Sequence, residues 1–147
     1  MTGKLKVLFL CTGNSCRSQM AEGWARHLLP EAVEAYSAGL SAKGLNPRAV
    51  RVMLDAGVDI SRQRSKEIDE VIHVPFDFVI TVCGHADEHC PAFPGTVIHA
   101  GFDDPPELAR EAKTEDEALR HFRRVRDEIR TFVLTLPAIL RKAPEGE

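Results

Sequence analysis

A short apolar run at residues 5–10 leads directly into a cysteine, and a compact loop separates that cysteine from an arginine. The loop reads Cys11-Thr-Gly-Asn-Ser-Cys-Arg17 and contains no proline. Its residues are small enough for their backbone N–H groups to point at one anion, while the planar guanidinium of Arg17 can bind two of the anion's oxygens. We therefore predict an oxyanion loop for arsenate or phosphate, with sulfate as an analogue, formed by Thr12, Gly13, Asn14, Ser15, Cys16, Arg17 and Ser18.

The residues after Arg17 predict a helix whose N-terminus makes Cys11 reactive. Apolar side chains recur at helical spacing as far as Leu28, which indicates a helix over 17–29. A helix N-terminus favours negative charge and therefore the thiolate of Cys11, and the hydroxyl of Ser18 can hydrogen-bond that sulfur. We predict that Cys11 is a nucleophile. The alternative is an ordinary strand-to-helix turn around a buried cysteine.

Length and composition indicate one compact domain. The chain has 147 residues, 44% of them hydrophobic, and we expect one domain over 1–140 with a charged tail at 141–147. A net charge of −3 argues against a nucleic-acid surface, and the N-terminal apolar run is too short for a signal peptide or a membrane span. We expect a cytoplasmic monomer. In a reducing compartment its four cysteines are more typical of catalytic, redox or metal sites than of a disulfide framework.

Strand and helix patterns alternate along the chain. This alternation predicts an α/β fold, a single-domain doubly wound parallel sheet of about four strands flanked by helices. Ligands bind at the carboxyl ends of the strands in such sheets, and Cys11 and Cys83 both follow predicted strands. The predicted strands cover 4–10, 33–37, 76–82 and 96–99, and the predicted helices cover 17–29, 47–56 (capped by Asn46), 65–72 and 114–139.

The string from Cys11 to Gly23, CTGNSCRSQMAEG, resembles the thioredoxin-coupled arsenate reductases of the low-molecular-weight protein tyrosine phosphatase superfamily. Three further strings occur in the family's order, namely AYSAGL from Ala35, GVDIS from Gly57 and FDDP from Phe102. The resemblance implies a low-molecular-weight phosphatase-like fold, with Cys11 as nucleophile and Arg17 as its oxyanion-binding partner. It also implies reduction of arsenate to arsenite, with thioredoxin as the electron donor.

A second cysteine pair, Cys83 and Cys90, is not required by phosphatase chemistry but suits a reductase. After Cys11 attaches to arsenate with loss of water, a thiol at Cys83 can attack the Cys11 sulfur and release arsenite. Cys90 can then attack Cys83 and move the disulfide away from the oxyanion loop, which regenerates Cys11. We therefore predict a three-cysteine relay recycled by thioredoxin, with weak phosphatase activity that depends on Cys11 and not on Cys90.

The spacing of this pair has a mechanical consequence. If residues 84–89 are helical, Cys83 and Cys90 lie about 10 Å apart along the helix axis. A disulfide requires their Cα atoms to come within roughly 7 Å. The segment must therefore unwind or fold over on oxidation, and we predict a mobile redox loop there.

Other interpretations of these cysteines stay open. A zinc site would use Cys83, His85, His89 and Cys90, although this spacing departs from the close cysteine pairs of structural zinc sites. Both cysteines could also be inert core residues. For the whole protein, the alternatives are a low-molecular-weight phosphatase with redox-sensing cysteines and a zinc-bearing or redox-responsive binding protein.

The family resemblance also marks Asp104, which directly precedes a proline, as the general acid that protonates the departing hydroxide. Asp103 is an alternative acid, and Asp104 can also cap a helix that begins at Pro105. The family's phosphotyrosine phosphatases carry aromatic residues after this Asp-Pro pair, whereas this chain continues Pro106-Glu-Leu108. We therefore expect a bare oxyanion as substrate and not a phosphotyrosine.

Some reductases of the family bind potassium beside the oxyanion loop, and Asn14, Glu22 and Ser37 match three of the ligand positions. At the fourth position this chain offers Lys66, whose ammonium can replace the cation electrostatically. We predict no obligatory metal or cofactor.

Cys16 matches a cysteine that forms a protective disulfide with the nucleophile in the phosphatases. We predict instead that Cys16 contributes mainly its backbone N–H to the oxyanion loop.

Arginines also cluster in the predicted helix over 114–139, where they would suit either a polyanion site or a solvated helix face. Acidic and apolar neighbours favour the solvated face for Arg120, Arg123, Arg124 and Arg126.

Overall fold

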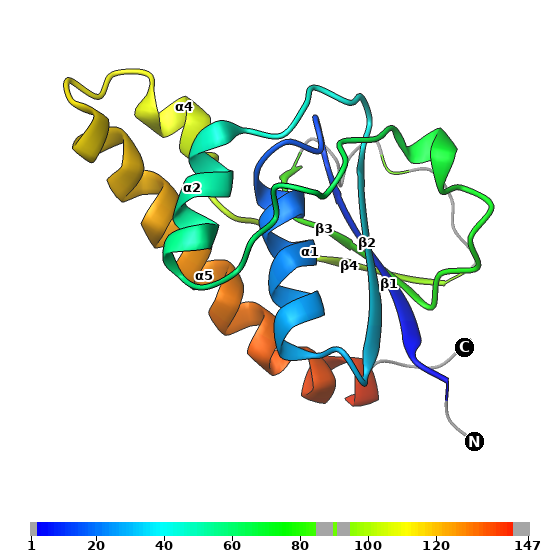
Figure 1. The fold of residues 1–147 in the computed structure, drawn as a ribbon. Coiled ribbons are helices and arrows are strands. Elements are labelled where there is room, and N and C mark those ends of the chain that lie inside the picture. The colour runs from blue at the N-terminus through cyan, green and yellow to red at the C-terminus, as the bar shows by residue number, and fades with distance from the viewer. Residues whose placement is uncertain (1–2, 85–89, 91–94, 143–147) are drawn as a thin grey trace.

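The structure is a computed structural model that describes residues 3–84, 90 and 95–142. Its centre is a four-stranded parallel sheet in the order β2-β1-β3-β4, which confirms the predicted α/β fold (Figure 1). The described strands are β1 (Leu5–Cys11), β2 (Val33–Gly39), β3 (Phe78–Thr81) and β4 (Thr96–His99).

The register of the strands brings the ends of β1, β2 and β3 together at one edge of the sheet. Cys11 pairs with Gly39 of β2, and Leu10 pairs with Thr81 of β3. The predicted strand over 4–10 therefore extends to Cys11, and that over 33–37 extends to Gly39, because the ladder continues for this distance. The nucleophile candidate occupies the last paired position of the central strand.

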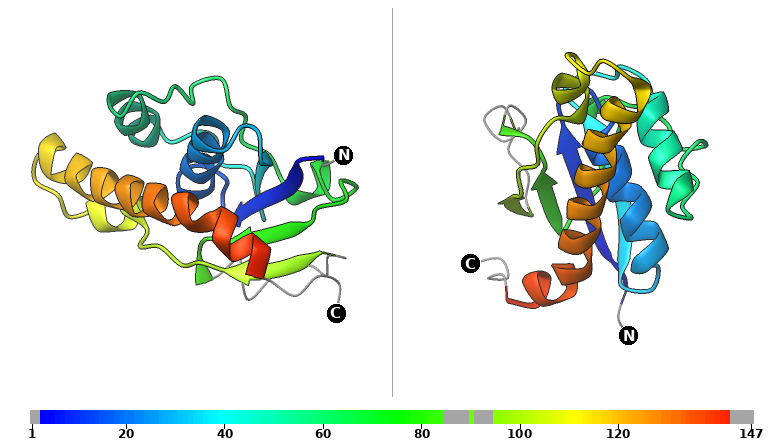
Figure 2. Two further views of the ribbon diagram at one scale, coloured as in Figure 1. Left: turned by 90° about the horizontal axis from the view of Figure 1, so that it is seen from below. Right: turned by 90° about the vertical axis from the view of Figure 1, so that its left-hand side faces the viewer.

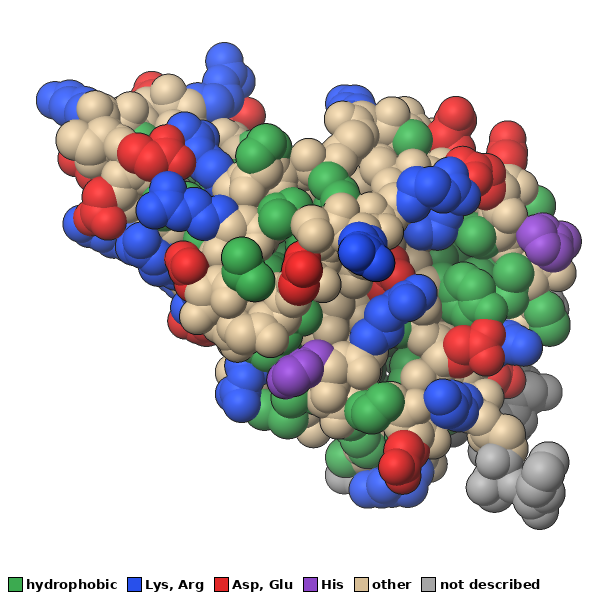
Figure 3. Space-filling model, in the orientation of Figure 1, with side chains coloured by type: hydrophobic (Ala, Val, Ile, Leu, Met, Phe, Trp, Pro, Cys, Tyr) green, Lys and Arg blue, Asp and Glu red, His purple; other side chains and the backbone are tan. Residues whose placement is uncertain are grey.

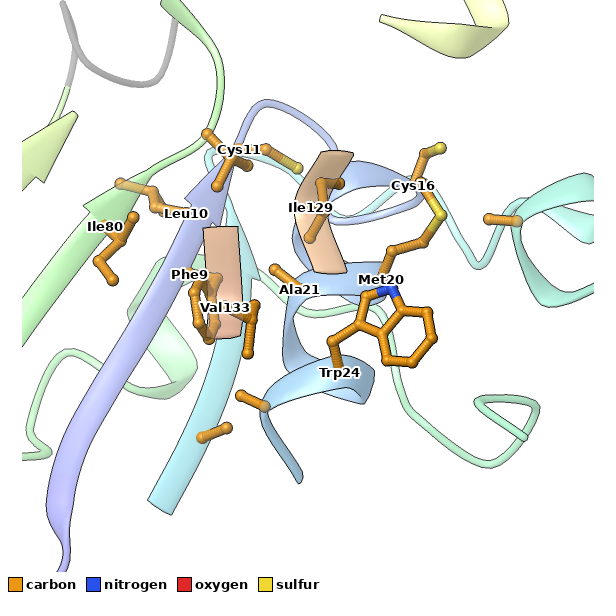
Figure 4. Close-up of a cluster of buried hydrophobic side chains, with 14 of the residues drawn as sticks. Phe9, Leu10, Cys11, Cys16, Met20, Ala21, Trp24, Ile80, Ile129 and Val133 are labelled. Carbon is orange, nitrogen blue, oxygen red and sulfur yellow. The ribbon is translucent and has the colours of Figure 1, made fainter. Parts of the chain in front are cut away.

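Three helices gather on one side of the sheet, α1 (Arg17–Leu28), α2 (Pro47–Asp55) and α5 (Glu115–Lys142) (Figures 1 and 2). A shorter helix, α4 (Pro105–Ala109), packs against α5. Figure 4 shows Ile129 and Val133 of α5 beside Phe9 of β1 and Ala21 of α1. These residues belong to a core of fully buried side chains that joins the helices to the central strand.

The start of α2 confirms the predicted capping. The side-chain oxygen of Asn46 accepts hydrogen bonds from the backbone N–H groups of Arg48 and Ala49 at 2.8 and 3.2 Å, and Pro47 holds the first helical position. The cap satisfies N–H groups that have no partner within the helix, and proline at this position carries no N–H that would need one. Gly57 follows the helix with φ of +88°, a conformation that glycine adopts without strain.

The prediction of a helix over 65–72 is wrong, because only a 3-10 turn forms there, Ile68–Glu70. The backbone of Lys66 instead bonds to the sheet edge: its carbonyl accepts from the Gly39 N–H at 2.9 Å, and its own N–H donates to the Asn14 side chain at 2.8 Å. Glu67 also forms an isolated bridge with Gly39. Because helical geometry would remove these contacts, tertiary structure overrides the local pattern.

The C-terminal helix is longer than predicted. It spans 28 residues, continues past Pro137 and ends at Lys142, beyond the expected end at 139. Proline removes one backbone hydrogen bond, but Leu136 and Leu140 on either side of it are buried and keep the last turns packed. The expected charged tail at 141–147 thus begins within the helix, and its residues 143–147 lie outside the described part of the chain. Of the helices described, none is long and apolar enough to cross a membrane.

We predict that Phe122→Ala lowers the free energy of unfolding by about 3–5 kcal/mol, because the Phe122 ring is fully buried on the inner stripe of α5. Leu134→Ala is a matched control on the same helix, since the Leu134 side chain is 48% exposed. Urea unfolding followed by circular dichroism measures both. Equal losses for the two variants would contradict the assignment of this stripe as the core face.

Candidate active site

The loop between β1 and α1 turns its carbonyl groups outward. The carbonyls of Cys11, Thr12 and Gly13 accept hydrogen bonds from the N–H groups of Leu40, Ser41 and Lys43 at 2.9–3.1 Å. Within the described part of the chain, no backbone hydrogen bond uses the N–H groups of residues 12–16. These groups are therefore available to an anion in the concavity of the loop, as the sequence predicts for an oxyanion site.

The side chain of Asn14 holds the loop in this conformation. Asn14 has φ of +48° and is fully buried. Its amide nitrogen donates to the hydroxyls of Ser18 and Ser37 at 2.9 and 3.0 Å. Its amide oxygen accepts from the Lys66 N–H at 2.8 Å and from the Gln19 side chain at 3.0 Å. This full set of partners stabilises a left-handed backbone conformation that only a few residue types tolerate.

The same hydrogen bonds reach Cys11 through the hydroxyl of Ser18. The Ser37 hydroxyl donates to the buried carboxylate of Glu22 at 2.5 Å, so its oxygen accepts from Asn14. The Ser18 oxygen likewise accepts from Asn14 and lies 2.8 Å from the Cys11 sulfur. Because a thiolate can only accept, the Ser18 hydroxyl is the donor whenever Cys11 is ionised. A donated hydrogen bond stabilises negative charge on that sulfur. The geometry therefore suits a nucleophilic thiolate.

Arg17 begins α1 and turns toward the segment after β4. Its guanidinium donates to the Phe102 carbonyl at 2.9 Å and lies 3.6 Å from the carboxylate of Asp104. The side chain of Arg17 is 13% exposed, whereas that of Asp104 is 46% exposed. A carboxylate thus stands at the mouth of the oxyanion loop, next to the arginine that would bind the substrate.

The two adjacent aspartates point in different directions. Asp104 occupies the N-cap position of α4, but within the described part of the chain its side chain makes no capping hydrogen bond. Asp103, the alternative acid, instead pairs with Arg124 of α5 at 2.9 Å. The structure therefore brings Asp104 to the oxyanion loop and directs Asp103 away from it.

Cys83 lies beside the oxyanion loop. It follows β3 by two residues, is buried, and its sulfur is 3.3 Å from the Thr12 hydroxyl. Cys90 is half-buried, and no disulfide joins any of the four cysteines, all of which are described. The predicted mobile redox loop, including His85 and His89, lies outside the described residues. Among the residues that are described, no group of three or more His, Cys, Asp or Glu side chains is placed to hold a metal ion.

Cys16 is chemically distinct from Cys11. Its side chain is buried on the side of Met20 and points away from Cys11 (Figure 4). Burial, with a smaller contribution from the neighbouring Cys11, raises the pKa of the Cys16 thiol far above its usual value. Cys16 therefore stays a neutral thiol at physiological pH, while its position in the loop leaves its N–H available to an anion.

The potential potassium ligands are already hydrogen-bonded to one another. Ser37 lies between Asn14 and Glu22, and Glu22 also pairs with Arg26 at 2.8 Å. The half-buried ammonium of Lys66 donates to the Arg64 carbonyl at 3.1 Å, and burial lowers its pKa while the charge of Glu22 acts in the opposite direction. The oxygens of this set are thus hydrogen-bonded or ion-paired within the chain, and the charge of Lys66 acts on Glu22 from the position where a fourth ligand would stand.

Gly39 is a site residue that sequence reasoning did not single out. A Cβ atom at this position would lie 2.4 Å from the Ser41 carbonyl oxygen and 2.6 Å from the Asn14 nitrogen. Because both neighbours are backbone atoms, neither can rotate away. The only sequence signal was its place in the string AYSAGL, and the strand pairing with Cys11 explains why glycine is required there.

Arg120, Arg123 and Arg124 lie on a solvated face of α5, as predicted. The prediction is wrong for Arg126, whose side chain is 14% exposed and donates to the Val52 carbonyl at 2.9 Å. Arg120 and Arg123 contact Asp116, Arg124 contacts Asp103 and Glu128, and Arg126 contacts Asp127. Figure 3 shows blue and red side chains intermixed over the N-terminal part of α5. A continuous basic surface for a polyanion is therefore not formed by these residues.

Comparisons with known proteins agree with this geometry. Residues 6–145 match the family model of low molecular weight phosphotyrosine protein phosphatases. An arsenate reductase of Bacillus subtilis is 54% identical over 125 residues, which cover 84% of this chain and 88% of that protein. A solved arsenate reductase in its phosphate-binding state superposes with a TM-score of 0.74 at 33% identity, covering 92% of this chain and 98% of that one. A thioredoxin-dependent arsenate reductase of Corynebacterium glutamicum superposes with a TM-score of 0.68 at 29% identity, covering 95% and 63%.

We predict that Gly39→Ala weakens the binding of inorganic phosphate at least tenfold, because the new Cβ displaces the backbone at Asn14. Isothermal titration calorimetry measures the affinity. Gly84→Ala, at the same edge of the sheet, is the control, since a Cβ there meets no atom of the described residues within 4 Å. Unchanged affinity in Gly39→Ala would show that the loop does not need this close approach.

We also predict that Ser18→Ala slows alkylation of Cys11 by iodoacetamide about tenfold at neutral pH, because the thiolate loses a donated hydrogen bond. Peptide mass spectrometry resolves the rate at Cys11 from those at the other cysteines. Ser41→Ala should alkylate at the normal rate, since that hydroxyl only reaches the Thr12 carbonyl at 3.4 Å. A normal rate in both variants would rule out a role for Ser18 in activating the sulfur.

Proposed function

Because this chain belongs to the low-molecular-weight phosphotyrosine protein phosphatase family, we propose that it is an arsenate reductase that transfers two electrons from thioredoxin to arsenate through three cysteines. The family assignment confirms the resemblance found in the sequence. Reduction of arsenate to arsenite places the protein in arsenical resistance. The main support for the proposal is the contact between the Thr12 hydroxyl and the Cys83 sulfur, because it brings a second thiol to the oxyanion loop.

In the first step, arsenate binds to the N–H groups of the oxyanion loop and to the guanidinium of Arg17. The thiolate of Cys11, which accepts a hydrogen bond from Ser18, attacks arsenic. A Cys11 sulfur–arsenic bond forms, and one arsenic–oxygen bond breaks. Asp104, 3.6 Å from Arg17, donates the proton with which this oxygen leaves as water.

In the second step, the thiolate of Cys83 attacks the Cys11 sulfur. The sulfur–arsenic bond breaks with its electron pair passing to arsenic, so As(V) becomes As(III) and arsenite leaves. The two sulfurs are oxidised to a Cys11–Cys83 disulfide. Parallel pairing of β1 and β3 favours this step, because both strands end at the same edge of the sheet.

In the third step, Cys90 attacks Cys83 and releases Cys11 as a thiolate. The resulting Cys83–Cys90 disulfide is reduced by an external dithiol through ordinary exchange. We propose thioredoxin as this dithiol and the cytoplasm as the compartment. The fold neighbour from Corynebacterium glutamicum, described as thioredoxin-dependent, supports this choice of donor.

A phosphate ester fits the same oxyanion loop, and its phosphoryl group can transfer to Cys11. Weak phosphatase activity therefore accompanies the reductase activity, in keeping with the family of this chain. Hydrolysis of the phosphoenzyme needs only water and a base, so it requires neither Cys83 nor Cys90. The requirement for Cys90 thus separates the two activities.

We predict that Cys90→Ser abolishes multiple-turnover arsenate reduction but leaves hydrolysis of p-nitrophenyl phosphate within about twofold of the wild type. Cys11→Ser should abolish both, because it removes the nucleophile. Arsenate-dependent oxidation of NADPH, coupled through thioredoxin and thioredoxin reductase, measures the first activity. Release of p-nitrophenolate measures the second.

The wild type must oxidise NADPH in this assay for the reductase assignment to hold. A wild type that hydrolyses the aryl phosphate but never reduces arsenate would instead be a phosphatase with redox-sensing cysteines. A Cys90→Ser variant with full multiple-turnover reduction would remove Cys90 from the relay and leave the roles of Cys11 and Cys83 intact.

A further inference from the structure

We propose that an ion pair on the surface of α5, Asp103 with Arg124, positions Asp104 as the general acid over the oxyanion loop. The two aspartates and Phe102 form one short segment, called here the acid loop, Phe102–Asp104. This inference rests on the proposed acid role of Asp104. It assigns a function to one of the arginines on the solvated face of α5.

Phe102 ties the acid loop to three parts of the molecule. Its N–H donates to the Val82 carbonyl at 3.2 Å, and its carbonyl accepts from Arg17 at 2.9 Å. Its ring meets that of Phe132 on α5 edge to face, with the centroids 5.8 Å apart. The backbone at the start of the acid loop is therefore fixed relative to β3, the oxyanion loop and α5.

Asp103 supplies a second attachment to α5, about two helical turns from the first. One nitrogen of Arg124 binds the Asp103 carboxylate at 2.9 Å, while its other terminal nitrogen binds Glu128 at 2.9 Å. Glu128 lies one turn further along the same helix, and its ion pair with Arg124 orients the guanidinium for the contact with Asp103. This arrangement reduces the rotamer freedom that an exposed arginine would otherwise lose on pairing.

These attachments determine where Asp104 points. Successive side chains in an extended segment lie on opposite sides, and Asp104 has φ of −92° and ψ of 101°. Because Asp103 is directed to α5, Asp104 is directed to Arg17. Little else holds the Asp104 side chain, which is 46% exposed and makes no capping hydrogen bond within the described structure. Release of Asp103 would let the exposed Asp104 carboxylate sample positions away from the substrate.

The leaving group of an aryl phosphate reports on this positioning. A general acid matters most when the departing oxygen is strongly basic, and little when the leaving group is stable as an anion. The kcat/KM for phenyl phosphate therefore depends on Asp104 far more than that for p-nitrophenyl phosphate. A change that merely loosens the fold or weakens anion binding would lower both values by the same factor.

We expect Arg124→Gln to lower kcat/KM for phenyl phosphate about threefold to fivefold, which is the range that the loss of one exposed ion pair gives. The kcat/KM for p-nitrophenyl phosphate should change by less than about 1.5-fold. Asp103→Asn should match it, and the double variant should lose no more than either single variant. The inhibition constant of inorganic phosphate should stay unchanged. Arg120→Gln is the matched control, because Arg120 lies one turn earlier and pairs with Asp116 of its own helix.

Asp104→Asn, measured beside these variants, separates the two levels of the argument. A large loss restricted to phenyl phosphate in Asp104→Asn, with none in Arg124→Gln, would overturn the positioning role and leave the acid role standing. Equal losses for both esters in Arg124→Gln, or additive losses in the double variant, would also overturn it. No selective loss in Asp104→Asn would overturn the acid role itself.

Discussion

The buried amide of Asn14 is the interaction on which the active site depends. Its backbone adopts a left-handed conformation, and its side chain uses both the amide nitrogen and the amide oxygen to bond four neighbouring groups. Those neighbours come from α1, β2 and the segment that follows Ile60, so the loop is shaped only when these parts are assembled. A buried polar group with every partner satisfied is stabilising, whereas one missing partner is costly. The oxyanion loop is therefore a product of the tertiary fold and not of its own seven residues.

Parallel strands explain how reductase chemistry can be added to a phosphatase-like loop. β1 and β3 are neighbours and end at the same edge, so any residue just after β3 lies next to the nucleophile. Cys83 in this position already contacts the oxyanion loop, with its sulfur 3.3 Å from the Thr12 hydroxyl. The same geometry would keep the two chemistries separable, because the loop that faces the anion is formed between β1 and α1, whereas the proposed relay cysteines lie beyond β3.

Much of the fold and of the site follows from the sequence. The run that ends at Cys11, the helical spacing after Arg17 and the cap at Asn46 are local signals, and each element formed where it was expected. The helix expected over 65–72 failed because Lys66 bonds to Gly39 and Asn14, which are distant in sequence. The separate directions of Asp103 and Asp104 were equally hidden, since they depend on Arg124, 21 residues along the chain. Local patterns carry no information about such partners.

The half-buried ammonium of Lys66 gives the site a charge that is part of the chain. A dissolved ion occupies a site in proportion to its concentration and exchanges with other ions of similar size. A charged side chain does not exchange with the solvent, because a covalent bond to the chain sets its local concentration. The conformational entropy lost in ordering the side chain is part of the free energy of folding. The positive charge that Lys66 contributes near Glu22 is consequently present in every folded molecule and needs no bound ion to supply it.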